Sequence, residues 1–536
     1  MKMTNLRKLS ATFGAAALVL TGLVAITPAA HAAAPTCLPA DKAGVTTCVG
    51  KLSNDAAYVV KVPENFGGTM FYWNHGFRPS YPYPTYTPPK GVEELTPGNS
   101  VTSKDVTAPM LAAGYGVASY DRVTAGLHGW NTAESVEMLK ELMDTIKAKF
   151  TTIKKSVIYG SSGASPVINR FVEKYPTYGD SVGLMAGLTP PAANEMKSLC
   201  DAFYILSVFA DPTIKGCAAM GVKGPNGHLL ALQEFGKVVA LLKGWQANYG
   251  TPDIAYPANM AAYKIPQRSA LLLTGLLIGL PTKSAHMDGI TTSDRVPEQS
   301  INATVAILEN LVDAIGTGTF AGQAISEITG PGFYDNTTTD WASLLSDEDS
   351  ARFNLGLSGD DGIAAMLGTL AKYPRTKGDA AAIAKLDALD PVKFTSTKPT
   401  ILISNEADRL VFPGNSALYV DKTMAVYEAR MADYESGKSK VKPVWNTLAM
   451  YAMTPETYTK YDAAGAPVLT AKATSPSGTG HQTFSVAQTM AWVKTLAQAA
   501  KYGKLPNENF ITQVLKQDSY LNKDRDYRPA DLKYMN

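Results

Sequence analysis

Hydrophobic positions along the first 190 residues alternate between two patterns. Short apolar runs bounded by turn residues predict buried strands, and apolar residues at helical spacing predict amphipathic helices. The predicted strands are Val49–Leu52, Ala57–Val62, Thr69–Trp73, Gly114–Tyr120, Lys155–Tyr159 and Val182–Leu188, and the predicted helices are residues 131–149 and Ala164–Tyr175. Strands that alternate with helices form βαβ units, so we expect a mostly parallel sheet flanked by helices.

The alternation stops at Pro190-Pro191 and returns in an apolar run, Pro399–Ser404. Helical patterns predominate between these points, at 229–243, 268–280, 301–315 and 379–389. The chain is therefore predicted to be a single α/β core, residues 33–190 and 396–536, with a large helical cap inserted at residues 191–395.

Two apolar stretches bear on membrane insertion, and both are shorter than the roughly 20 residues that cross a bilayer. The first, Phe13–Ile26, follows a basic start and precedes Ala30-His31-Ala32, which is the order of a secretory signal peptide. Residues 1–32 are thus predicted to be a cleaved signal peptide. The mature protein is expected to be secreted or periplasmic, without stable membrane insertion. The second stretch, Ser269–Leu280, is expected to be a buried helix, with a wall of a lipophilic pocket as the alternative.

The balance of charges argues against one class of partner. The chain has 49 Lys and Arg against 47 Asp and Glu. Loss of residues 1–32 would change the formal net charge from +2 to about −1. Such a chain has no basic field for nucleic acid or anionic lipid. The sequence carries no signal for a particular oligomeric state.

Four cysteines remain in the predicted mature chain, Cys37, Cys48, Cys200 and Cys217. An even number in an exported protein predicts disulfides. Pairing of neighbours, Cys37 with Cys48 and Cys200 with Cys217, is the simplest of three connectivities. A metal site is the alternative, but no CxxC spacing and no nearby pair of histidines supports it, so no metal is expected.

Candidate chemistry begins in a Gly/Ser-rich segment between a predicted strand and a predicted helix. A serine on a sharp strand-to-helix turn projects its hydroxyl above the sheet edge. Such a turn admits only small residues two positions before and two positions after the nucleophile. Gly160 and Ala164 flank Ser162 in this way, whereas Tyr159 stands before Ser161. Ser162 is therefore the predicted nucleophile, and a Gly/Ser loop without chemistry is the alternative.

A serine hydroxyl needs a base, and the base needs an acid that fixes its tautomer. His481 lies in a Gly-rich loop between a candidate strand at Val468–Ala473 and a predicted helix at 486–501. Asp408 follows the apolar run that ends at Ser404. It is favoured over Glu406 as the acid because it lies later in the loop that must reach the histidine.

The chain order Ser162, Asp408, His481 is that of α/β-hydrolases. Four segments carry a resemblance to this superfamily: Asn74-His-Gly-Phe77, Gly160-Ser-Ser-Gly-Ala164, Asn405-Glu-Ala-Asp408 and Gly480-His481. The sequence resembles the superfamily over about residues 45–190 and 395–505, and the helical insertion stands where that family places its cap. Ala164 departs from the family pattern, which usually has glycine there.

The resemblance implies a serine hydrolase that forms an acyl-enzyme and needs no metal or organic cofactor. It further implies an oxyanion hole formed by the backbone N–H groups of Phe77 (or Gly76) and Gly163. His75 would shape this turn rather than transfer protons. The expected substrate is a small-molecule carboxylic ester. Tyr81 and Tyr83 of a Pro/Tyr-rich loop that follows this turn are candidate substrate contacts, with a rigid surface loop as the alternative.

Two alternative functions stay open at this point. An exported aminopeptidase of the same fold would need an acidic group in the cap for the substrate's ammonium group. The candidates are Glu309, Asp313, Asp347 and Glu348. A non-catalytic binding protein on this fold would instead need a broken triad, and all three positions are filled.

Overall fold

The computed structural model describes most of the chain after the predicted signal peptide. The described residues are 34–83, 86–98, 105–189, 191–247, 258–289, 296–461, 463, 468 and 475–534. Residues 1–32 lie outside this part of the chain, as do residues 469–473 of the candidate strand before His481. Both of these predictions therefore stay predictions.

A sheet of nine strands is the framework of the described chain. The strands are β1 (Thr36–Cys37), β2 (Val45–Lys51), β3 (Ala57–Pro63), β4 (Thr69–Asn74), β5 (Gly116–Tyr120), β6 (Lys155–Ser161), β7 (Ser181–Met185), β8 (Thr400–Asn405) and β9 (Thr447–Ala452). Their order is β1-β2-β3-β5-β4-β6-β7-β8-β9. The first three pairs in this order, β1–β2, β2–β3 and β3–β5, are antiparallel. Every later pair, from β5–β4 to β8–β9, is parallel. The carboxyl ends of β4, β6 and β8 therefore lie at the same edge, where sheets of this kind bind ligands.

Helices cover both faces of the parallel strands, which explains the continuous apolar runs in the sequence. Alternate side chains of β4 show this arrangement. Tyr72 packs in the core shared with α2 (Thr132–Lys149) and α3 (Ser165–Lys174), and Trp73 packs in the core shared with α14 (Val486–Tyr502). The core helices are completed by α1 (Thr107–Ala112), α13 (Gly414–Glu435) and α15 (Glu508–Leu515).

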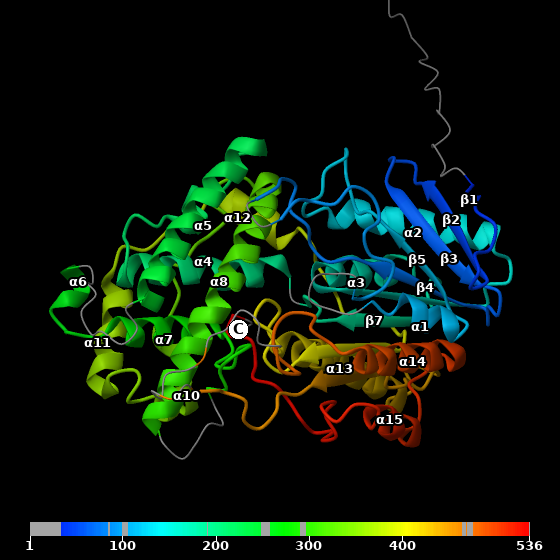
Figure 1. Ribbon diagram of the computed structural model, residues 1–536. Helices are drawn as coiled ribbons and strands as arrows, with labels where there is room; N and C mark the ends of the chain where they lie inside the picture. Colours follow the sequence, from blue (N-terminus) through cyan, green and yellow to red (C-terminus); the bar gives the residue numbers. More distant parts are fainter. Residues whose placement is uncertain are drawn as a thin grey trace, which may run out of the picture. The chain divides into compact units, whose positions relative to one another are not determined.

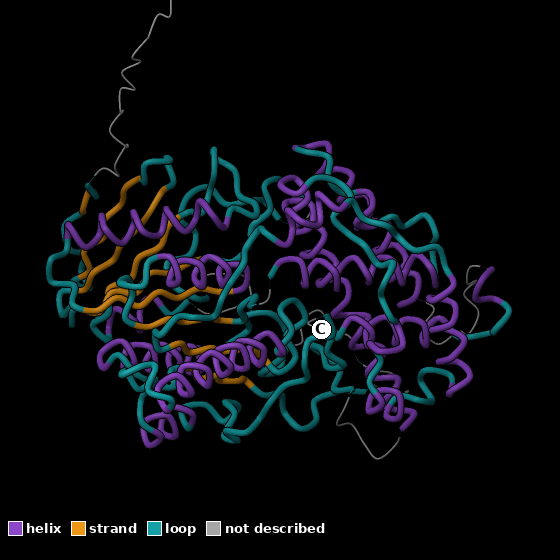
Figure 2. The backbone as a smooth tube through the Cα atoms, turned by 180° about the vertical axis from the view of Figure 1, so that it is seen from behind, coloured by secondary structure: helices purple, strands orange, loops and turns teal. Residues whose placement is uncertain are grey.

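Between β7 and β8 the chain leaves the sheet, and the regular elements of its described residues there are helices. They are α4 (Ala192–Phe209), α5 (Gly224–Ala247), α6 (Ala258–Ala261), α7 (Gln267–Ile278), α8 (Val296–Thr329), α9 (Trp341–Leu344), α10 (Asp347–Arg352), α11 (Gly359–Lys372) and α12 (Ala380–Asp387), with a 3₁₀ turn at Gly216–Ala219. They are gathered beside the sheet and share a hydrophobic core of their own (Figures 1 and 2). The apolar helix α7 is buried within this core at every position except Arg268, as expected.

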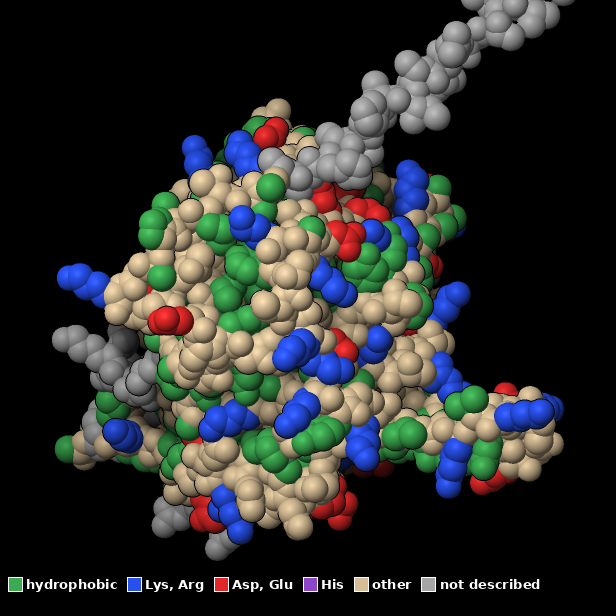
Figure 3. Space-filling model, turned by 90° about the vertical axis from the view of Figure 1, so that its right-hand side faces the viewer, with side chains coloured by type: hydrophobic (Ala, Val, Ile, Leu, Met, Phe, Trp, Pro, Cys, Tyr) green, Lys and Arg blue, Asp and Glu red, His purple; other side chains and the backbone are tan. Residues whose placement is uncertain are grey.

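Two disulfides join cysteines that are neighbours in the sequence. Cys37 pairs with Cys48 between β1 and β2, and Cys200 of α4 pairs with Cys217. This is the simplest of the three connectivities that the sequence allowed. Among the described helices, none has the length and apolar character needed to cross a membrane. On the face drawn in Figure 3, basic and acidic side chains are interspersed.

Candidate active site

Strand β6 ends in a sharp turn at Ser162. The φ angle of Ser162 is 52°, in the left-handed region that is strained for a residue with a side chain. A single 3₁₀ turn, Ser162–Ala164, then leads into α3. Ser161 instead ends β6, and its hydroxyl is buried without a hydrogen-bond partner. The backbone thus presents Ser162 at the sheet edge in the geometry of a nucleophile elbow.

Gly160 shows how tightly this turn is packed. A Cβ atom on Gly160 would lie 2.5 Å from the Asn74 carbonyl oxygen and 2.9 Å from Ile168 Cδ1. Gly160→Ala is therefore expected to lower the free energy of unfolding by about 1–3 kcal/mol, measured by urea denaturation. Gly368→Ala is the control, because no atom lies within 4 Å of its added Cβ. That helical substitution should stabilise the protein by about 0.5–1 kcal/mol. Equal effects of the two substitutions would contradict this account.

Asp408 is held in place by several hydrogen bonds in the loop after β8. Its side chain is fully buried, and its Oδ1 accepts hydrogen bonds from the backbone N–H groups of Leu410 (2.9 Å) and Val411 (3.0 Å). Its Oδ2 lies 2.9 Å from Nδ1 of His481. This leaves Nε2, the other ring nitrogen of His481, as the atom that could accept a proton.

Glu406, the alternative acid, has a different set of partners. Its carboxylate accepts hydrogen bonds from Lys283 Nζ (2.8 Å) and from the backbone N–H of Thr454 (2.6 Å). Lys283 belongs to the segment between α7 and α8. Glu406 therefore ties the helical part of the chain to the sheet, and only Asp408 of the two carboxylates reaches His481.

Backbone and amide groups tie the loop of Asp408 to the loop of His481. The Ala407 N–H donates to the Gly478 carbonyl (2.8 Å), and the Gly480 N–H donates to the Ala407 carbonyl (3.1 Å). The side chain of Asn405 donates to the Gly480 carbonyl (2.8 Å). These bonds fix the histidine loop. Asn405 belongs to one of the motifs that resemble the superfamily, but no local pattern indicated this role.

Gln482 occupies the proton-accepting side of His481. Its side-chain Nε2 lies 2.8 Å from Nε2 of His481, and its φ angle is 58°. The hydroxyl of Ser162, in contrast, has no hydrogen-bond partner in the described part of the chain. The amide of Gln482 therefore bonds to the nitrogen that His481 would use as the predicted base for Ser162. No sequence motif pointed to Gln482.

Removal of this amide is expected to make Ser162 more reactive. Gln482→Met should raise the second-order rate of labelling by a fluorophosphonate probe about 2–10-fold, the worth of one net hydrogen bond. Gln517→Met is the control, since the side chain of Gln517 bonds only to the exposed Lys494 among the described residues. Slower labelling of Gln482→Met would show instead that the amide holds the imidazole in its productive orientation.

The turn after β4 packs directly against the nucleophile turn. A Cβ on Gly76 would lie 3.2 Å from Ser162 Cβ, and a Cβ on Gly163 would lie 3.1 Å from the backbone nitrogen of Phe77. Within the described residues, the N–H of Phe77 donates no hydrogen bond. The structure thus brings Phe77 and Gly163, the two predicted oxyanion donors, next to each other and next to Ser162.

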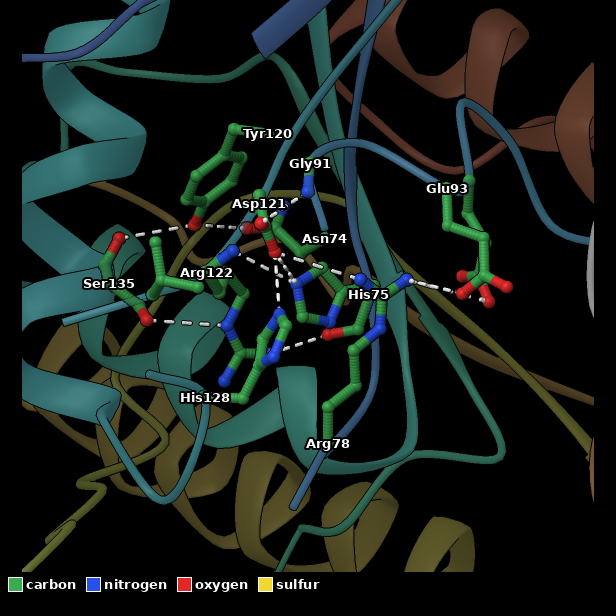
Figure 4. A network of polar contacts seen from close by, with 12 residues as sticks. Asn74, His75, Arg78, Gly91, Glu93, Tyr120, Asp121, Arg122, His128 and Ser135 are labelled. Atoms are coloured by element: carbon green, nitrogen blue, oxygen red, sulfur yellow. Dashed lines mark hydrogen bonds and ion pairs between the residues drawn. The ribbon is translucent and has the colours of Figure 1, made fainter. Parts of the chain in front are cut away.

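A buried polar network supports this turn (Figure 4). His75 bonds through Nδ1 to the Gly76 carbonyl (2.8 Å), and its Nε2 accepts the backbone N–H of Arg122 (3.0 Å). The guanidinium of Arg122 donates to the His75 carbonyl (2.5 Å). Burial and the charges of Arg78 and Arg122 hold the pKa of His75 well below its usual value. His75 is therefore neutral at pH 7 and fixes the backbone of the turn.

His75, Asp121 and His128 also have the spacing of metal ligands, because their donor atoms all lie within 4.8 Å of one another. These donors already have partners. Nε2 of His75 is bonded to Arg122, and Nε2 of His128 is bonded to Asp121 Oδ1 at 2.6 Å. The guanidinium of Arg78 lies 3.7 Å from the same Asp121 oxygen. A divalent cation would have to displace these bonds and share the pocket with two guanidinium groups, so the cluster suits a hydrogen-bond network and not a metal.

A cavity lies beside Ser162, between the sheet edge and the helices that follow β7. Phe77, Trp130 and Leu410–Phe412 contribute to its wall from the α/β core. The helices α4, α7 and α8 contribute Met196, Leu199, Ile278, Leu311, Ile315 and other residues. Most of the lining is apolar, as in typical small-molecule sites. Apart from Ser162, the polar residues in the lining are Glu195, Ser198 and Thr317.

The Pro/Tyr-rich loop is placed away from this cavity. Tyr83 stacks on Phe320 of α8 with ring centroids 4.4 Å apart, and Tyr81 lies 5.6 Å from the ring of His228 on α5. Neither tyrosine lines the cavity beside Ser162. Their rings contact α5 and α8, and both side chains stay partly exposed.

The four acids named as ammonium ligands have partners or lie on the surface. Glu309 accepts from Ser284 (2.6 Å) and lies 3.0 Å from His286, and Asp313 pairs with Arg409 at 2.6 Å. Asp347 and Glu348 belong to α10, which has no buried residue. None of the four lines the cavity beside Ser162.

The order of the strands and the turns at their ends together identify the fold. A parallel sheet with β5 between β3 and β4 carries a nucleophile elbow after β6, an acid after β8 and a histidine after β9. The chain has the α/β-hydrolase fold. No family model matches its sequence, and no curated protein matches it.

Solved structures of esterases and lipases resemble this hydrolase fold distantly. The rice cell wall degrading esterase LipA from Xanthomonas oryzae is 10% identical over 80% of this chain and 92% of that chain, with a TM-score of 0.31. Feruloyl esterase B from Aspergillus oryzae is 12% identical over 89% of this chain and 88% of that chain, with a TM-score of 0.35. Lipase A from Candida antarctica in its closed state is 12% identical over 91% and 90% of the two chains, with a TM-score of 0.34. The fold assignment rests on the strand order and the turns.

Proposed function

We propose that this protein is an exported serine hydrolase that cleaves small-molecule carboxylic esters. One observation carries the proposal. His481 bonds to the fully buried Asp408, and the residues that follow Asp408 line the same cavity as Ser162. The strained backbone of Ser162 supports its role as the nucleophile. Residues 191–395 would serve as the cap, since their helices supply much of the cavity wall.

The reaction is a two-step acyl transfer. Nε2 of His481 takes the proton of Ser162 while Oγ bonds to the carbonyl carbon of the ester, and Asp408 stabilises the resulting imidazolium. The N–H groups of Phe77 and Gly163 bind the negative oxygen, and each such donor is typically worth about 3–4 kcal/mol. The imidazolium then protonates the alcohol that leaves. Water, deprotonated by His481, releases the acid and restores Ser162.

The cavity favours an ester over a peptide. A peptidase of the type considered from the sequence needs an acid in the cap that is free to bind ammonium. None of the four acids considered for that role meets this need, because Glu309 and Asp313 bond to other side chains and the exposed Asp347 and Glu348 lie on α10. Glu195 does line the cavity, but burial raises its pKa to about 7 and so disfavours the ionised form that an ammonium group requires. The apolar lining instead suits a hydrocarbon part of an ester.

The test compares wild type with Ser162→Ala on p-nitrophenyl esters and on aminoacyl-p-nitroanilides. Cleavage of esters by wild type alone is the expected result. Cleavage that is faster on anilides with a free α-amine would replace the ester proposal with the peptidase. Failure of a fluorophosphonate probe to label wild type, together with inactivity on both panels, would favour a binding protein.

A further inference from the structure

Glu195 is a carboxyl group inside the cavity that the proposed mechanism does not use. It lies in the first turn of α4 and lines the cavity together with Ser162. Its neighbours in the wall include Trp130, Met196 and Phe412. A carboxyl in such a setting is costly to bury, so its place beside the nucleophile needs an explanation.

One oxygen of this carboxyl, Oε1, is enclosed and has no hydrogen-bond partner among the described residues. The amide of Asn415 lowers the pKa of Glu195, but its Nδ2 donates to the Phe412 carbonyl at 3.0 Å. No ion pair joins Glu195 to a Lys, Arg or His among the described residues. A buried polar atom without a partner costs about 1–3 kcal/mol, and rotation of the carboxyl toward a polar group in the cavity would recover this energy.

The electrostatic surroundings favour the neutral form of this carboxyl. Burial raises the pKa of Glu195 to about 7, the Asn415 side chain opposes the rise, and the nearby charge of Asp408 adds to it. Both protonation states are therefore populated near neutral pH. A ligand that bonds well to Glu195 must therefore accept a hydrogen bond from the protonated acid and donate one to the ionised carboxylate.

A hydroxyl group meets this condition. It donates to the ionised carboxylate and accepts from the protonated acid, whereas an ammonium group suits only the ionised form. We infer that Glu195 selects esters whose cavity-bound part carries a hydroxyl group on a short carbon chain. This inference rests on the proposed function, because it concerns the substrate of the same site. Glu195 would be a specificity-determining residue and not a member of the triad.

Two matched pairs of esters test the inference from both sides of the ester bond. The acyl pair is p-nitrophenyl butyrate and p-nitrophenyl 3-hydroxybutyrate. The alcohol pair is butyl acetate and the monoacetate of 1,4-butanediol, followed by titration of the released acid. In wild type, kcat/KM should favour the hydroxylated member of at least one pair by tenfold or more. Glu195→Leu should bring that ratio to about one and raise kcat/KM for the plain ester.

Glu195→Gln is the matched variant, because its amide keeps both a donor and an acceptor at the same position. It should retain at least a threefold preference. Labelling by a fluorophosphonate probe gives the fraction of folded, reactive enzyme in each preparation. If Glu195→Leu lost kcat/KM equally on both members of each pair, the role of Glu195 would be merely structural, and the inference would be overturned.

Two further outcomes are also decisive. Preference of wild type for a glycyl ester over an acetyl ester, lost in Glu195→Gln, would show an ammonium site and overturn the hydroxyl assignment. Cleavage that depends on Ser162 but has the same ratios in wild type and Glu195→Leu would overturn the inference and leave the proposed function intact. Absence of any cleavage that depends on Ser162 would overturn the proposed function itself.

Discussion

Ser162→Ala is expected to lower kcat on a p-nitrophenyl ester by about 10⁶ while the protein stays folded. Without Oγ no acyl-enzyme forms, and only binding and the oxyanion donors remain to speed direct attack by water. That residual rate is typically about 10³–10⁴ above the uncatalysed reaction. The measurement is initial ester hydrolysis, with circular dichroism and urea denaturation to show that the fold is intact.

Ser161→Ala is the matched control, since the two serines are adjacent but differ in placement. The hydroxyl of Ser161 is buried at the end of β6 and has no hydrogen-bond partner among the described residues, so its loss removes none of the bonds seen there. We expect kcat within about threefold of wild type, because burial of an unpaired hydroxyl is unfavourable in any case. A large loss in Ser161→Ala, with near-normal activity in Ser162→Ala, would reverse the assignment.

The strands at the centre of the sheet were the easiest part of the fold to predict. Strands buried on both faces are continuous apolar runs, which stand out against polar turns. The predicted Thr69–Trp73 and Lys155–Tyr159 correspond to β4 (Thr69–Asn74) and β6 (Lys155–Ser161). The order of the strands could not be predicted in this way, because the pairing of β3 with β5 depends on contacts distant in sequence.

Two elements near the acid were missed for identifiable reasons. The helix α13 is buried only over its first six residues, and these are mostly small or polar, so no apolar stripe marks its length. The strand β9 is short, and it is stabilised by its pairing with β8, which no local pattern reveals. The parallel strand between the acid and the histidine is β9, earlier in the chain than the candidate strand at Val468–Ala473.

The residues of the site also differ in whether a local sequence pattern could predict them. Ser162 could be proposed because the small residues around it reflect a local steric constraint, and the added Cβ at Gly160 shows that constraint in space. Gln482 and Glu195 carried no local signal. A proline at the start of a helix is common, so Pro191 could have predicted the beginning of α4. Only tertiary packing, however, places Glu195 in the cavity.

His481→Ala is expected to lower kcat by about 10⁶, as much as the loss of the nucleophile, because the two residues act as a unit. A serine hydroxyl without a base stays protonated and reacts slowly. Labelling by a fluorophosphonate probe should therefore fail as well, although Ser162 is still present. Added imidazole should restore part of the rate in His481→Ala and none in Ser162→Ala. Undiminished labelling of His481→Ala would exclude this histidine as the base.

Loss of the acid, Asp408, is expected to lower kcat less than loss of His481, and this difference tests the role of Asp408. Asp408→Ala should lower kcat by about 10⁴, because the imidazole keeps its lone pair but loses its orientation and the stabilisation of its charged form. Glu406→Gln is the control, since an amide can keep the bonds to Thr454, and kcat should stay within about threefold. If Glu406→Gln lost more activity than Asp408→Ala, the acid would have to be reassigned. The 2.9 Å contact of Asp408 with Nδ1 of His481 would then be a structural bond only.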